Sequence, residues 1–191
     1  RTPKKILKKL NKSTIIFDDA KKLLDFNDYD LLVELIGGEG GIAKEIIINS
    51  LNKNKSVVTA NKALVAQHGI EILKIAEKKN CKIAFEAAVA GGVPVIKVLK
   101  EFLLSNKIKK VFGILNGTSN YILSKMEETN KDFSAILKDA QEMGYAESDP
   151  SFDIDGTDTA HKLSILSMVA YGKVMDFKTV FIEGIEKIEI D

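Results

Sequence analysis

The chain has 191 residues, of which 45% are hydrophobic and 29% are charged, with 13 Gly and 3 Pro. This composition excludes collagen-like, low-complexity and wholly disordered proteins. Because 28 Lys and Arg balance 27 Asp and Glu, the net charge does not indicate a nucleic-acid or membrane partner. The length suits one or two domains with a proper core.

Charge is nevertheless uneven along the chain. Residues 1–12 carry six bases and no acid, which predicts a solvated helix face. Residues 139–158 carry seven acids and no base, and they include two Gly, Pro150 and aromatic residues. We therefore expect this acidic stretch to form a loop with a defined conformation.

The single cysteine, Cys81, excludes an internal disulfide, and no segment resembles a signal peptide or a long apolar run. These features predict a cytoplasmic protein. No acid-base partner stands beside Cys81, so we interpret it as structural. The chain opens without an initiator Met, and we expect it to be a fragment.

Apolar runs and helical patterns alternate through the first two thirds of the chain, which favours βαβ units around a largely parallel sheet. Buried strands are predicted at 30–36, 56–59 and 82–85, and helices at 42–52 and about 62–79. Gly69 lies inside the second helix and costs about 1 kcal/mol relative to Ala. The sequence therefore allows either a continuous helix or one interrupted near His68.

Beyond residue 85 the alternation changes. Pro94 suits the first turn of a helix that runs to about 104. Further on, the pattern predicts a strand at 108–115, helices after 116–120, at 133–143 with Gly144 as the cap, and at 156–171, and one or two strands in 179–190. The predicted fold class is α/β, with a partial Rossmann-type nucleotide-binding region over 1–85 and a mixed α+β region over 86–191.

A glycine-rich loop follows the first predicted strand. The segment 38–43, Gly-Glu-Gly-Gly-Ile-Ala, formally fits the dinucleotide fingerprint G-x-G-x-x-G/A. That fingerprint expects an acid at the end of the next strand, whereas here the next strand ends in Ala60-Asn61-Lys62. We therefore favour a loop that turns tightly or lets the backbone approach a ligand.

The segment from Thr59 to Lys62 lies at the carboxyl end of a buried strand, where open α/β sheets bind ligands. An amide and a cation there could hold a phosphate or carboxylate, or orient a carbonyl. Asn61 as a helix cap beside a solvated Lys62 is an equally good interpretation.

The acidic stretch continues into the predicted helix at 156–171. An EF-hand is excluded because the last ligand position would fall on Lys162 instead of Glu. Asp158 and Lys162 are four residues apart, so they share one helix face and can pair. Such a pair is usually solvated and weak, but in a cleft Asp158 would hold Lys162 as a proton donor. His161 points about 100° away, and we interpret it as structural.

Four segments together resemble homoserine dehydrogenase, in the family's order and with similar spacing. They are VVTANKALVAQHG, FEAAVAGGVPVIK, GILNGTSNYILSKM and GYAESDPSFDIDGTDTAHKLSIL. The resemblance runs from about Asp28 to the C-terminal end. It implies an NAD(P)H-dependent oxidoreductase that reduces aspartate 4-semialdehyde to L-homoserine, toward threonine and methionine, and it implies a homodimer.

The resemblance also implies roles for individual residues. Lys162 is expected to donate a proton to the carbonyl oxygen, with Asp158 positioning it and Lys62 near the reacting carbon. The expected substrate-binding residues are Glu147, Asp153, Tyr145 and Thr118, and the expected cofactor contacts are Thr59, Lys62 and Gly117. By the same resemblance, residues 1–85 are a partial nucleotide-binding domain and 86–191 a substrate-binding and dimerisation domain.

The family also holds a monovalent cation, usually sodium. The resemblance places it in a turn, mainly through carbonyl oxygens of Glu86, Val89, Gly91 and Val93. Carbonyl ligands suit a hard cation, although a tight turn without metal is the alternative.

The sequence departs from the family at both ends. Before Leu31 we find no strand, glycine-rich loop and helix of the family's first βαβ unit, a piece on the order of 30 residues. The C-terminal end also stops short of the family's final helices. A non-catalytic remnant that only binds substrate or dimerises is therefore the second hypothesis, and a different α/β oxidoreductase is a third.

Overall fold

A three-stranded parallel sheet occupies the first half of the chain in the computed structural model, which describes residues 9–173 and 176–190. The strands are β1 (Leu31–Glu34), β2 (Ser56–Thr59) and β3 (Ile83–Ala84), in the order β1-β2-β3. Glu34 stands opposite Thr59, so the carboxyl ends of β1 and β2 lie level with each other. The α/β class is confirmed.

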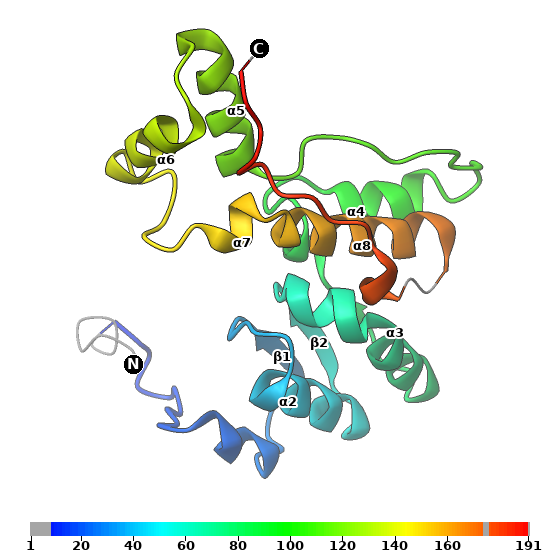
Figure 1. The fold of residues 1–191 in the computed structure, drawn as a ribbon. Coiled ribbons are helices and arrows are strands. Elements are labelled where there is room, and N and C mark those ends of the chain that lie inside the picture. The colour runs from blue at the N-terminus through cyan, green and yellow to red at the C-terminus, as the bar shows by residue number, and fades with distance from the viewer. Residues whose placement is uncertain (1–8, 174–175, 191) are drawn as a thin grey trace.

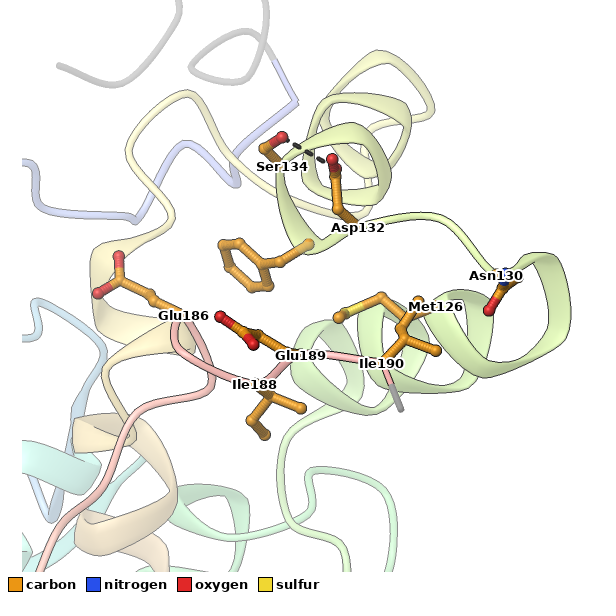
Figure 2. Close-up of a pocket in the computed structure, with 9 residues that line it drawn as sticks. Met126, Asn130, Asp132, Ser134, Glu186, Ile188, Glu189 and Ile190 are labelled. Atoms are coloured by element: carbon orange, nitrogen blue, oxygen red, sulfur yellow. Dashed lines mark hydrogen bonds between the residues drawn. The ribbon is translucent and has the colours of Figure 1, made fainter.

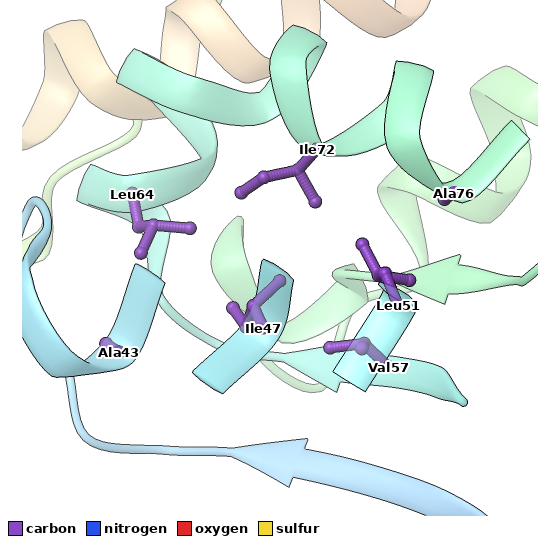
Figure 3. Close-up of a cluster of buried hydrophobic side chains, with 7 residues drawn as sticks. All are labelled: Ala43, Ile47, Leu51, Val57, Leu64, Ile72 and Ala76. Carbon is purple, nitrogen blue, oxygen red and sulfur yellow. The ribbon is translucent and has the colours of Figure 1, made fainter. Parts of the chain in front are cut away.

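Two helices cover this sheet and make its core. They are α2 (Gly41–Asn52) and α3 (Lys62–Lys78), preceded by a short 3-10 helix η1 (Ala20–Leu24). Their buried apolar side chains pack with Val57 of β2 in one cluster (Figure 3), and those side chains are Ala43, Ile47, Leu51, Leu64, Ile72 and Ala76. The predicted helices and the strands at 56–59 and 82–85 are thus confirmed within one or two residues.

Gly69 does not break α3. It is buried, and a Cβ there would lie 3.3 Å from the terminal carbon of Met168 on α8 (Thr157–Tyr171). The glycine therefore lets α3 and α8 approach closely.

The remaining regular elements of the described chain are helices, joined by irregular segments. It contains η2 (Glu86–Ala88), α4 (Val95–Lys97) continuing as the π-helical turn η3 (Val98–Phe102), α5 (Gly117–Thr129), α6 (Phe133–Glu142), α7 (Ser151–Ile154), α8 and η4 (Phe177–Thr179). A second core cluster joins α3, the turn after β3, α4 and α8, and a third joins α5, α6 and α7. The C-terminal segment runs past α8 to α5 (Figure 1).

The predicted strands at 108–115 and 179–190 are wrong, because among the described residues β1, β2 and β3 are the only strands. Phe112 and Ile114 are 83% and 78% exposed. A β-branched apolar run needs a neighbouring strand to supply its hydrogen bonds, and no described segment pairs with either run.

The strand predicted at 30–36 is present as β1, but the expectation that it is buried is wrong. β1 is an edge strand in the described chain, and Leu31, Val33, Leu35 and Ile36 are exposed. Glu34 is the buried residue of this strand. Of the basic N-terminal segment, residues 1–8 lie outside the described residues, and residues 9–12 form turns instead of a helix. Within the described part of the chain, no helix is long and apolar enough to cross a bilayer.

Candidate active site

Asp158 is the centre of a charge cluster between α3 and α8. It lies in the first turn of α8, which starts after Gly156 at a φ of +87°, and it is 1% exposed. Lys162, one turn further on, places its Nζ 2.6 Å from Oδ2 of Asp158. Lys62, the first residue of α3, forms an ion pair with Oδ1. The predicted i,i+4 pairing is present, and its carboxylate is buried.

The approach of Lys62 depends on the turn between β2 and α3. The Asn61 side chain caps α3 by accepting the Leu64 amide at 3.1 Å, and the Thr59 hydroxyl accepts the Asn61 amide at 3.0 Å. Asn61 is therefore a helix cap, as one of the two interpretations held. Lys62 is not simply solvated, because it reaches the buried carboxylate and its Nζ lies 5.5 Å from the ring centre of Phe152.

Lys162 is held by two acceptors. Its Nζ donates to the Leu115 carbonyl at 2.7 Å and to Asp158 at 2.6 Å. An ammonium carries three donors, so one remains without a partner among the described residues. Since the side chain of Lys162 is only 19% exposed, burial limits the positions from which an acceptor can reach this third N–H.

Asn116 and Asp153 complete the cluster. The Asn116 amide nitrogen donates to Oδ1 of Asp153 at 2.8 Å and to Oδ2 of Asp158 at 2.9 Å. Burial by itself would raise the pKa of Asp158, but hydrogen bonds from Lys162, Lys62 and Asn116 outweigh it and hold the pKa below its usual value. Asp158 is therefore ionised at neutral pH.

A cavity of about 470 Å³ opens beside the cluster. Its walls come from the glycine-rich loop, the start of α3, the turn after β3, α7 and α8: Gly37, Gly38, Glu39, Ala60, Asn61, Lys62, Ala63, Ala87, Ala88, Ala90, Gly91, Phe152 and Lys162. The amide nitrogen of Asn61 is buried there without a hydrogen-bond partner among the described residues. The site thus offers two cations and a free amide donor to one space.

Glu34 shapes the loop side of this cavity. It is 2% exposed, and its carboxylate accepts the Ile36 and Gly37 amides and the Thr59 hydroxyl. Gly37 has a φ of +85°, which favours glycine at this turn. The loop's backbone therefore reaches the cavity, in agreement with the favoured interpretation. Thr59 points to Glu34 and is 1% exposed, so its side chain does not line the cavity.

The other expected substrate residues lie outside the cavity wall. The Thr118 hydroxyl donates to the Tyr145 carbonyl at 3.1 Å, and the Tyr145 ring stacks on Tyr121. Glu147 is exposed, and its carbonyl accepts the Gln141 side chain. Gly117 is the exposed first residue of α5. The structure therefore brings Lys62, Lys162, Asp158 and Asp153 together in one cluster. Thr118, Tyr145, Glu147 and Gly117 lie outside that cluster.

The expected cation turn borders the same cavity through Ala90 and Gly91. Ala90 and Gly92 have φ values of +50° and +89°, so the turn is tightly curled. The Glu86 carboxylate accepts the Ile96 and Lys97 amides, so this side chain is engaged within the turn. Among the described residues no cluster of three acidic, His or Cys side chains could hold a metal ion.

His161 is structural, as interpreted. It is fully buried, its ring stacks on Phe177 at 4.5 Å and lies 5.6 Å from Phe152, and neither nitrogen has a hydrogen-bond partner in the described chain. Burial lowers its pKa. A second cavity, of about 640 Å³, lies between α5, α6 and the C-terminal segment (Figure 2), and none of the expected site residues lines it.

Two family models match the chain. The model described as homoserine dehydrogenase, NAD binding domain, matches residues 2–86, and the model described as homoserine dehydrogenase matches residues 94–191. The similarity therefore starts near residue 2, well before the Asp28 start expected from the sequence motifs.

Individual relatives agree. The chain is 49% identical over 177 residues to a homoserine dehydrogenase of Neisseria gonorrhoeae, covering 93% of this chain and 40% of that protein. It is 50% identical over 161 residues to that of Pseudomonas aeruginosa, covering 84% and 37%. The chain thus spans about two-fifths of the length of these curated relatives.

Solved structures show the same fold. A homoserine dehydrogenase from Thiobacillus denitrificans superposes with a TM-score of 0.85 at 48% identity, covering 90% of this chain and 40% of that one. A hyperthermophilic archaeal homoserine dehydrogenase in complex with NADPH gives 0.78 at 33% identity, covering 88% and 52%. The family is one of NAD(P)-dependent oxidoreductases. The two matching models, the shared fold and the cluster of charges at its cavity lead to one conclusion: this chain belongs to the homoserine dehydrogenase family.

Proposed function

We propose that the protein carrying this chain reduces aspartate 4-semialdehyde to L-homoserine with NAD(P)H, in the synthesis of threonine and methionine. The observation that supports this most is the cluster of two ammonium groups on one buried carboxylate at the wall of a cavity. A carbonyl reduction needs a proton donor and a positive charge beside the oxygen, and these residues can supply both.

Lys162 supplies the proton in this proposal. A nicotinamide held at the cavity would supply the hydride for the aldehyde carbon, and the oxygen needs one proton to become the alcohol. Two of the three donors of Lys162 are engaged by Leu115 and Asp158, so the third is left for the substrate oxygen. Asp158 holds the ammonium group in place for the transfer, and solvent restores the proton afterwards.

Lys62 stabilises the same oxygen electrostatically. It shares the carboxylate of Asp158 with Lys162 but comes from a different element, α3. Two cations anchored on one anion hold a fixed positive potential toward the cavity, and this potential lowers the energy of the developing oxyanion.

The residues at the cavity fit a nicotinamide cofactor. The buried Asn61 amide nitrogen has no protein partner in the described chain, and it suits a carboxamide or phosphate oxygen. The loop at Gly37 and Gly38 brings backbone without side chains to the same wall. Thr59 and Gly117 remain proposed cofactor contacts, and Glu147, Asp153, Tyr145 and Thr118 remain proposed substrate contacts.

A monovalent cation, usually sodium in the resemblance, would bind the turn at Glu86, Val89, Gly91 and Val93. The positive φ values of Ala90 and Gly92 curl this turn, and carbonyl oxygens are suitable ligands for a hard cation. Glu86 and Val93 each accept one amide already, which leaves a second lone pair on each oxygen. The cation would tie the turn to the cavity wall.

The arrangement in domains and assembly is part of the proposal. We assign 1–85 to nucleotide binding and 86–191 to substrate binding and dimerisation, and we expect a cytoplasmic homodimer. The matches to two separate family models, 2–86 and 94–191, support this division.

Cofactor titration tests the proposal against a remnant that only binds substrate or dimerises. We expect NADPH fluorescence to change at micromolar concentration and homoserine to be oxidised when NADP is present. Homoserine binding without any cofactor response would instead identify a non-catalytic module. Turnover of other aldehydes with aspartate semialdehyde ignored would indicate a different oxidoreductase.

A further inference from the structure

Asn116 is the residue on which the two carboxylates of the site converge. It is 6% exposed and lies at the N-cap of α5. Its Oδ1 accepts the Ser119 amide at 2.8 Å, and its Nδ2 donates to Asp153 at 2.8 Å and to Asp158 at 2.9 Å. The side-chain amide has two donors, and both are used on acids of the site.

These bonds restrict the orientation of Asp158. Its Oδ2 receives a hydrogen bond from Asn116 on one side and from Lys162 on the other, while its Oδ1 is left to Lys62. A carboxylate held by donors on several sides cannot rotate without losing one of them. Both lysines are therefore placed through an anion whose plane is fixed from α5.

Asn116 also separates two negative charges with a neutral donor. Asp153 comes from α7 and Asp158 from α8, and neighbouring carboxylates tend to share a proton. The Asn116 amide donates a hydrogen bond to each of these carboxyl groups and carries no charge itself. The charged groups that face Asp158 are Lys62 from α3, Lys162 from α8 and, through Asn116, Asp153; His161 neighbours it on α8.

We propose that Asn116 is a positioning residue for the reaction: its amide holds Asp153 and Asp158 apart and fixes Asp158 so that Lys162 presents its free donor to the substrate oxygen. This inference rests on the proposed function for its kinetic consequences. The hydrogen-bond geometry itself is independent of which substrate is used.

A helix cap alone does not require this residue. Ser and Asp cap helices as well as Asn does, but neither supplies an amide with two donors beside an acceptor. Asn116→Ser therefore keeps the cap and removes the bonds to the acids. Asn116→Asp keeps the cap and the shape, and it adds a third carboxylate.

The test compares both variants with the parent in the full-length protein, over a range of pH. For Asn116→Ser we expect kcat to fall about tenfold to a hundredfold, since a hydrogen bond to a charged group is lost, with a smaller change in KM. For Asn116→Asp we expect a larger loss and an acid limb of the kcat profile that moves to higher pH. Asp132→Ser, at the cap of α6, is the matched control and should leave kcat unchanged.

A second measurement does not need turnover. Carbon-13 NMR of the aspartate carboxyl groups should show the pKa of Asp158 higher in Asn116→Asp than in the parent. If the protein proves inactive but this shift appears, the proposed function fails and the positioning geometry stands. If kcat and the pH profile of Asn116→Ser match those of the parent, the bonds to the acids do not matter and Asn116 is only a cap. Should that variant not fold, an unchanged pH profile and NMR titration in Asn116→Asp overturn the inference.

Discussion

At the scale of single residues, Lys162 is the side chain whose surroundings differ most from those of an ordinary surface lysine. It is partly buried, bound to a buried carboxylate and to a backbone carbonyl, and it faces a cavity. Exposed i,i+4 pairs contribute roughly 0.3–0.5 kcal/mol. Asp18–Lys22 is such a pair in this chain, so it serves as the comparison.

Replacing Lys162 with Ala should lower kcat for the reduction of aspartate 4-semialdehyde by about a hundredfold or more, because a general acid is lost. KM should change less, since the donor acts mainly in the transition state. Steady-state kinetics of the full-length protein measures both constants. Lys22→Ala removes a lysine from the exposed pair of the same spacing and should leave kcat at the parent value. An unchanged kcat in Lys162→Ala would remove this residue from its role.

His161 should make stability depend on pH. Its burial lowers the folded-state pKa below the usual 6.5, so the unfolded chain binds a proton at a higher pH than the folded one does. The free energy of unfolding should therefore decrease as pH falls below 6.5 and level off once the folded-state pKa is passed.

His161→Leu removes this group at similar volume. We expect its unfolding free energy at neutral pH to equal or exceed that of the parent, because two unpaired buried nitrogens are removed. Below pH 6.5 the advantage of the variant should grow. Urea unfolding at a series of pH values measures the difference, and a constant difference across that range would contradict the argument.

At the scale of elements, the start of α8 is fixed by the C-terminal segment. The Ile185 amide donates to the Ile154 carbonyl at 2.9 Å, and Gly184 and Gly156 lie where the two backbones touch. A Cβ on Gly184 would stand 2.8 Å from the Ile154 carbonyl oxygen. Only glycine allows this contact with Ile154, three residues before the helix that carries Asp158.

Gly184→Ala should therefore push the C-terminal segment away from the turn at 154–156. We expect a loss of about 1–3 kcal/mol in unfolding free energy, as for other overpacked sites, together with a lower kcat from the displaced start of α8. Gly113→Ala is the control, since nothing lies within 4 Å of a Cβ there. Equal stability of the two variants, measured by urea unfolding, would refute the tight contact.

The observed helices and strands also show which sequence patterns predicted secondary structure correctly. The strand at 56–59 and the helices at 42–52, 62–79 and 156–171 were predicted because their apolar spacing is local and strong. The runs at 108–115 and 179–190 have the composition of strands. A strand also needs an adjacent strand for its backbone hydrogen bonds, and no segment of the described chain pairs with either run. Residues 31–36 likewise looked buried although they form an edge.

At the scale of the whole molecule, the described chain leaves several large apolar side chains exposed, four of them between residues 102 and 114. Phe102, Leu104, Phe112, Ile114 and Phe181 are each at least 70% exposed. Exposed apolar groups of this size are typical of interaction sites. The surface therefore agrees with the proposed homodimer.

Phe112→Asp should weaken that dimer, because a charge would be buried at the contact without a partner. Sedimentation velocity of the full-length protein over a dilution series should show the dissociation constant rising at least about tenfold. Leu10→Asp, at a distant exposed apolar residue, should leave it unchanged. A dimer as tight as that of the parent would place the contact elsewhere.

Some residues of the candidate site could likewise be predicted from local spacing, whereas others depend on contacts distant in the chain. Asp158 and Lys162 could be paired from the sequence because helical geometry alone puts residues four apart on one face. Asn116 was read only as part of a helix start, and Glu34 as one residue of an apolar run; a lone acid inside that run was the signal that could have singled it out. Neither role can be found without knowing which distant backbone and side-chain groups surround the residue.

The family, the α/β class, most helices and the helical spacing of the acid and the base follow from the amino-acid sequence, because each depends on motifs or on residues close together in the chain. The burial of Asp158, its contact with both Lys62 of α3 and Lys162, and its link through Asn116 to Asp153 are seen only in the packed fold. The packing of α3 against α8, which a glycine at 69 permits, brings these groups together. Contacts across such distances in the chain are set by packing and not by local pattern.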